Sequence, residues 1–221
     1  MPDNIRRSRP EPPGGLPRIV HAPGLAKETL DQLAPLLSES GIDINDIQVD
    51  SLDQLQAALN SAVERHNMML HTPVGPARKD ALTMLAAFTQ AVDDGDTARA
   101  AQILNAVPPE AADGHATVAA CIGVALGCVD QWLAEATAGA PSTLRDTVRL
   151  PPGHWEGERA ARDVLALARK GRAYSSLDRL TIGHGGLHLL YGSALAVAAA
   201  LRAWAAAAGE PLANVTTTHL A

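Results

Sequence analysis

The sequence predicts an all-α protein, a helical bundle built around two long, alanine-rich, buried helices. Aromatic residues make up only 3% of the 221 residues, so the core must consist mainly of Ala, Leu, Val and Ile. Alanine has the highest intrinsic helix propensity, whereas aromatic and β-branched residues favour strands. Two apolar stretches, at 115–138 and 184–208, have the length and composition of helices buried on most of their circumference.

The second of these stretches carries no Asp, Glu, Lys or Arg between Gly185 and Leu201. It is long enough to cross a membrane, but it is mostly alanine and is interrupted by His188 and Arg202. We therefore expect a core helix of a soluble protein and no membrane span.

The chain before residue 111 is expected to form two regions. Residues 1–17 are rich in Pro, Gly and Arg and predict a disordered tail. Residues 18–110 predict an N-terminal helical layer or subdomain, with its first helix at 25–39. The core would then occupy residues 111–221 and contain the paired helices.

Local signals define further helices in the N-terminal layer. Ser51 is a predicted N-cap for a helix that continues to about residue 71. Pro76 suits the first turn of another helix, which ends near Val92 and is followed by an antiparallel helix at 97–106. The acidic residues of the turn between these two helices are expected to cap the second helix and to be solvated.

The C-terminal half contains a linker, a helix at 158–171, a short helical segment at 175–180, and a short helix after Pro211. Ser175 or Ser176 is the predicted cap of the short segment.

The two core stretches resemble each other when one is shifted by 69 residues. Each has small residues four positions apart, Gly123 with Gly127 and Gly192 with Ala196, and such strips allow helix backbones to approach closely. Two interpretations stay open: an internal duplication whose halves pack through these strips, or coincidence between alanine-rich helices.

The net charge and the two cysteines limit which classes of function and which cellular compartment we expect. The net charge of −6 argues against broad nucleic-acid binding, which requires a basic surface. Cys121 and Cys128 lie about 10 Å apart on one predicted helix, too far to form a disulfide bond. They are expected to be buried thiols in a cytoplasmic protein.

Histidines supply the candidate site residues. His184 and His188 are four residues apart, the spacing at which one helical face presents two metal ligands, and Tyr191 continues that row. His154, in a Pro- and Gly-rich loop, and His66 are further candidates for lining a pocket. The pattern favours structural roles over metal binding: a cap at the helix entry for His184, a core-edge residue for His188, and a loop anchored by Trp155 for His154.

One short motif resembles the attachment site of acyl and peptidyl carrier domains. Asp50-Ser51-Leu52 stands at the start of a predicted helix and is followed by an amphipathic run. The resemblance implies that Ser51 would carry a phosphopantetheine arm. Its role as an N-cap explains the same residues without that chemistry, and we expect no cofactor.

These patterns do not contain a set of residues that is typical of a catalytic site. The sequence therefore predicts a soluble, cytoplasmic interaction or scaffold protein that acts on a protein partner or by self-association, as in a homodimer. The alternative is a helical enzyme, or a small-molecule- or metal-binding protein, with a histidine-lined pocket.

Overall fold

A computed structural model of the chain describes residues 70–109, 115–134 and 140–220, with a few isolated positions before residue 70. The chain divides into two compact units, Met1–Met69 and Leu70–Ala221. The predicted tail at 1–17 and the predicted cap at Ser51 lie outside the described residues, as does most of the predicted helix at 25–39. The second unit is called the helical unit below.

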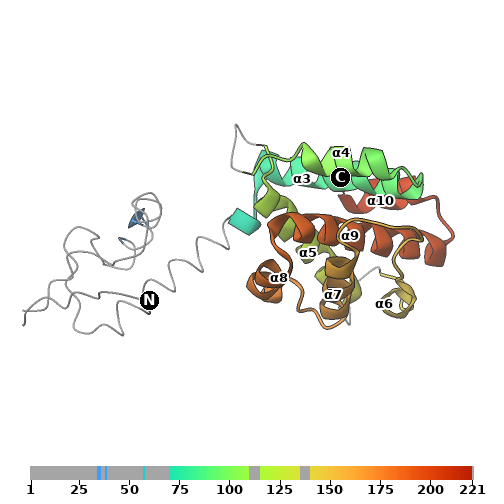
Figure 1. The fold of residues 1–221 in the computed structure, drawn as a ribbon. Coiled ribbons are helices and arrows are strands. Elements are labelled where there is room, and N and C mark those ends of the chain that lie inside the picture. Colours follow the sequence, from blue (N-terminus) through green and yellow to red (C-terminus); the bar gives the residue numbers. More distant parts are fainter. Residues whose placement is uncertain are drawn as a thin grey trace, which may run out of the picture. The chain divides into compact units, whose positions relative to one another are not determined.

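All regular structure in the described residues is helical, which confirms the all-α prediction. In the labelling of Figure 1, the elements in chain order are α3 (Gly75–Asp93), α4 (Thr97–Asn105), α5 (Val118–Leu133), α6 (Leu144–Thr147), α7 (Glu158–Ala168), the 3-10 turn η1 (Tyr174–Ser176), α8 (Leu177–His184), α9 (Gly186–Ala208) and α10 (Leu212–Leu220).

Helix α9 forms the centre of the helical unit. It packs most extensively against α7 and α5, and it also contacts α3, α6, α8 and α10 (Figure 1). Every residue from Leu189 to Leu201 is buried, so no face of this segment is available to water. This is why the sequence of α9 lacks charged residues there.

By length and composition, α9 is the one described helix that could cross a membrane. Most of it is buried within the helical unit, as in the core helix of a soluble protein. The structure is thus compatible with a soluble protein.

Helices α3 and α4 form the predicted hairpin, and α3 packs against both α5 and α9. Asp96 caps α4 by accepting a hydrogen bond from the Arg99 N–H at 2.9 Å. Asp93, at the end of α3, pairs with Arg202 of α9 at 2.8 Å. The acidic turn therefore caps one helix and links the hairpin to the central helix.

Helices α5 and α9 pack against each other, and an aromatic cluster joins their C-terminal parts. The rings of Trp132 and Trp204 meet edge to face, with centroids 6.2 Å apart. His219 of α10 lies against Trp204, with centroids 4.0 Å apart. The cluster thus fastens α10 to both core helices.

Helices α5 and α9 do pack against each other, but not through Gly123 and Gly192, as one of the two interpretations of the sequence supposed. A side chain at Gly192 would first meet Ala160 of α7, and a side chain at Gly123 would meet the backbone of His71. Nothing lies within 4 Å of a Cβ at Gly127. The small residues of the two helices therefore lie against different neighbours. The internal duplication stays a prediction.

Candidate functional site

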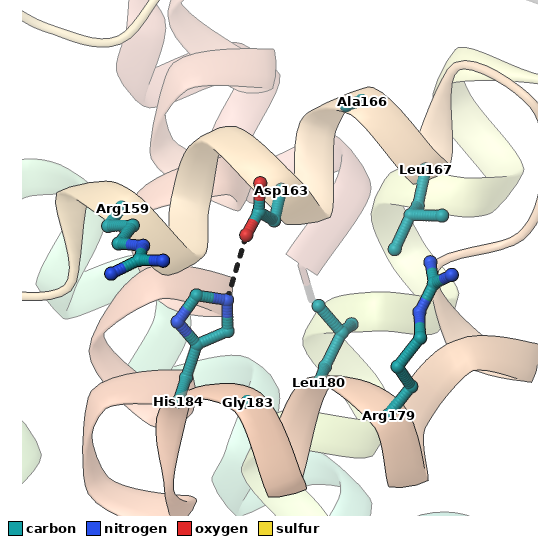
Figure 2. A pocket seen from close by; sticks show the side chains of 8 residues that line it. All are labelled: Arg159, Asp163, Ala166, Leu167, Arg179, Leu180, Gly183 and His184. Carbon is teal, nitrogen blue, oxygen red and sulfur yellow. Dashed lines mark hydrogen bonds and ion pairs between the residues drawn. The ribbon is translucent and has the colours of Figure 1, made fainter.

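An open groove of about 420 Å³ lies between α7 and α8 on the surface of the helical unit (Figure 2). Its walls combine charged and apolar side chains. The lining residues are Arg159, Asp163, Ala166 and Leu167 from α7, and Arg179, Leu180, Gly183 and His184 from α8.

Helical periodicity places each set of lining residues on one face of its helix. The α7 residues recur at intervals of four, three and one, and the α8 residues at one, three and one, so each set follows a single stripe. The opposite face of α7 is apolar and faces the core through Ala161, Val164 and Ala168. The groove is therefore formed by the outer edges of two helices that are held in place from beneath.

Asp130 of α5 fixes the start of η1, the turn that leads into α8. Its two carboxylate oxygens accept hydrogen bonds from the backbone N–H groups of Ala173 and Tyr174, each at 2.8 Å. Burial raises the pKa of Asp130, and the two N–H donors oppose that rise. The Tyr174 hydroxyl in turn lies 2.6 Å from the Thr72 hydroxyl. These hydrogen bonds fix η1, which directly precedes α8, the second wall of the groove.

Ser176 holds the predicted N-cap position of α8, but no serine side chain caps this helix. The side chain of Ser176 makes no capping hydrogen bond, and Ser175 donates backwards to the Arg172 carbonyl. The Asp130 carboxylate instead accepts from the backbone N–H groups at the start of η1, and sequence spacing gave no sign of this contact.

An imidazole–carboxylate pair joins the two walls of the groove. His184 Nε2 lies 3.0 Å from Asp163 Oδ2, as drawn in Figure 2. The His184 side chain is 11% exposed, and that of Asp163 is 57% exposed. The imidazole ring is therefore largely covered, while the carboxylate keeps a face open to water.

Arg159 and Arg179 are exposed at opposite ends of the groove (Figure 2). Within the described part of the chain, neither guanidinium group has a hydrogen-bond or ion-pair partner. By contrast, Arg162 pairs with Glu158 one turn away, and Arg169 donates to backbone carbonyls. As far as the described residues extend, the groove presents two unpaired arginines and one carboxylate, which is already paired with His184.

The structure separates the histidines and the tyrosine that the sequence analysis groups together. His184 is the last residue of α8, and Gly185, with φ 78°, ends that helix before α9 begins. The predicted shared helical face of His184 and His188 is therefore wrong, because the two residues lie on different helices. His188 is exposed on the first turn of α9.

Tyr191 is buried and directed toward α4. Its hydroxyl donates to the Asn105 side chain at 3.1 Å. Burial is the main cause of its raised pKa, with a further contribution from the charge of Glu156. Tyr191 therefore holds α9 to α4 and does not line the groove.

The loop histidine His154 is exposed, while its neighbour Trp155 packs against the core. The Trp155 ring N–H donates to the Pro152 carbonyl at 3.2 Å, which closes the loop on itself. His66 lies outside the described residues. Among the residues with described positions, no three His, Cys, Asp or Glu side chains are arranged to hold a metal ion.

Sequence reasoning missed Arg159, Asp163 and Arg179 as site residues. Asp163 and His184 are 21 positions apart, and only the turn between α7 and α8 brings them together. The available signal was weak: Arg159 and Asp163 at i and i+4 on a strongly amphipathic helix.

The groove is suited to binding. Its lining offers two guanidinium groups that can hold anionic groups, an imidazole–carboxylate pair, and an apolar floor. None of the lining side chains carries a hydroxyl or a thiol that could act as a nucleophile. Comparison of the chain with known protein families, curated proteins and solved structures finds no match.

Proposed function

We propose that the helical unit is a protein-interaction module of a soluble, cytoplasmic protein, and that it binds its partner in the α7–α8 groove. The observation that supports this most directly is the exposure of Arg159 and Arg179 at the two ends of a partly apolar groove, with no partner for either among the described residues. Arginine beside apolar surface is typical of the residues that dominate protein interfaces.

Exposed apolar residues next to the groove also support an interface. Ile182 is 86% exposed and Leu187 is 50% exposed, and both lie beside the junction of α8 and α9. The neighbouring Gly183 and His184 line the groove itself. A partner that covered the groove and this junction would remove apolar surface from water, which favours association.

Site-specific photo-crosslinking tests the proposal. Ala166 is exposed in the groove, so a benzophenone amino acid at this position should give a discrete adduct in cells of the source organism. The control position is Thr217, which is exposed on α10, on the other side of α9 from the groove (Figure 1). An adduct at both positions, or at neither, would contradict the proposal. An adduct whose mass is twice that of the chain would identify the partner as a second copy.

A second candidate function is small-molecule binding, and the largely covered His184 ring in the groove lining favours it. Native mass spectrometry of the full chain, purified without chelators, separates the two candidates. A mass excess that is lost when His184 is replaced by Asn would favour a small ligand. The unmodified mass of the chain, or a multiple of it, would favour the interaction module.

A further inference from the structure

We infer that the partner segment is an acidic amphipathic helix, with two carboxylates about two helical turns apart and uncharged apolar residues between them. This inference rests on the proposed function and names the chemistry of the partner. It follows from the order of charges along the groove, from the distance between those charges, and from the backbone of the two walls.

The charges of the groove alternate along its length. Figure 2 shows Arg159 at one end, Arg179 at the other end, and the Asp163–His184 pair on the inner side of Arg159. A complementary ligand therefore presents an anionic group at each end. An acidic group opposite Asp163 would be repelled, so the middle of the ligand is uncharged.

The length of α7 sets the spacing of the anionic groups. Arg159 and Leu167 are eight residues apart on this helix, about 12 Å at 1.5 Å per residue. Arg179 lies at the Leu167 end of the groove (Figure 2). On a ligand helix, residues i and i+7 lie about 10.5 Å apart on the same face, which long arginine side chains can reach.

The walls of the groove favour a helical ligand over an extended one. An extended peptide usually gains affinity by hydrogen bonding to an exposed strand edge. Both walls here are helices, whose interior backbone groups are bonded within the helix. A helix satisfies its own backbone and needs only side-chain contacts, and Ala166 and Gly183 leave room for it, since nothing lies within 4 Å of a Cβ at Gly183.

Fluorescence anisotropy with defined peptides tests the inference on the full chain. The probe is a fluorescein-labelled, helix-stabilised peptide of about 18 residues, with Glu at positions i and i+7 and Leu at i+3 and i+4. One control carries Lys in place of both Glu residues. A second has the same composition, with Glu at i and i+4. We expect the first peptide to bind about tenfold more tightly than either control, and less tightly as salt rises.

Charge reversal in the protein completes the test. Replacing both groove arginines, Arg159→Glu with Arg179→Glu, should abolish the preference and make the Lys peptide the better ligand. The matched control is Arg172→Glu, which changes an exposed arginine outside the groove lining and should leave binding unchanged. Far-ultraviolet circular dichroism of each variant shows whether it is folded.

Two results would overturn the inference. One is equal binding of the three peptides, and the other is a preference that survives reversal of both groove arginines. If the peptides give either of these results while position 166 still gives a specific crosslink, the acidic-helix inference is wrong and the proposed interaction module stands. If Ala166 also gives no specific crosslink, the proposed function fails as well.

Discussion

Gly157 and Gly192 bring the backbones of α7 and α9 into direct contact. A Cβ at Gly157 would lie 2.5 Å from the Gly192 nitrogen, and a Cβ at Gly192 would lie 2.9 Å from the Gly157 carbonyl oxygen. Gly157 also has φ 75°, a left-handed backbone conformation that residues other than glycine rarely adopt. Because Gly157 immediately precedes α7, this contact sets the position of one groove wall against the core.

The first prediction concerns the cost of adding a methyl group at this contact. In Gly192→Ala the new Cβ would lie 2.5 Å from Ala160 Cβ, so α7 must move away from α9. We expect a loss of about 1–3 kcal/mol in the free energy of unfolding. Urea denaturation followed by circular dichroism measures it.

The matched control is Gly127→Ala in α5. Nothing lies within 4 Å of a Cβ at this position, and alanine is the better helix former. The control should therefore raise the free energy of unfolding by up to about 1 kcal/mol. A change of the same sign in both variants would show that the backbone contact does not decide the effect.

Local sequence signals predicted the helices well, but they did not predict which helices pack against each other. Pro76 and Pro211 mark helix starts through their own backbone chemistry, so these boundaries could be located without knowledge of the fold. The helix that packs against Gly192 could not be predicted in this way, because small residues permit close packing without specifying which helix approaches. One interpretation of the sequence placed α5 against Gly192, whereas the structure places Gly157 and the first turn of α7 against it.

The candidate site was predicted only in part, and for a similar reason. His184 was singled out but was paired with His188 by helical spacing. The backbone at Gly185 ends that periodicity, so the true partner of His184 is Asp163, on the preceding helix. Such a pairing depends on how α7 and α8 pack, and no local pattern carries that information.

The second prediction concerns Asp130. Asp130→Ala removes both acceptors from the N–H groups of Ala173 and Tyr174 and leaves them unsatisfied in a partly buried position. We expect a loss of about 1–3 kcal/mol in stability, and a smaller loss for Asp130→Asn, which keeps one acceptor. Amide hydrogen exchange at Ala173 and Tyr174 should be faster in the Ala variant. Unchanged exchange would show that Asp130 does not hold the start of η1.

The third prediction concerns the reactivity of the two thiols. Burial raises the pKa of Cys121 to about 12 and that of Cys128 to about 11, so almost no thiolate is present near neutral pH. Iodoacetamide at about pH 8 should leave the native chain unmodified, and in concentrated guanidinium chloride it should add two carbamidomethyl groups. Intact mass spectrometry distinguishes the two states. Rapid labelling of the native protein would contradict the burial of these thiols in α5.

The fourth prediction is a pH dependence that arises at His219. This ring lies against Trp204, and burial lowers its pKa below the ordinary value of 6.5. The unfolded chain therefore binds a proton more readily than the folded chain does. The stability contributed by the neutral ring is complete above about pH 6.5 and is lost as pH falls from 6.5 toward the lower folded-state pKa.

Urea denaturation across the pH range, carried out on the natural chain and on His219→Phe, isolates this contribution. The Phe variant keeps an aromatic ring against Trp204 but cannot take up a proton. The difference in unfolding free energy between the two chains should change with pH only below about 6.5, with a slope of at most about 1.4 kcal/mol per pH unit for one proton. Because every other titrating group is common to both chains, its contribution cancels in this difference. Parallel curves throughout would mean that His219 titrates alike in both states and is not held in the aromatic cluster that fastens α10 to the core.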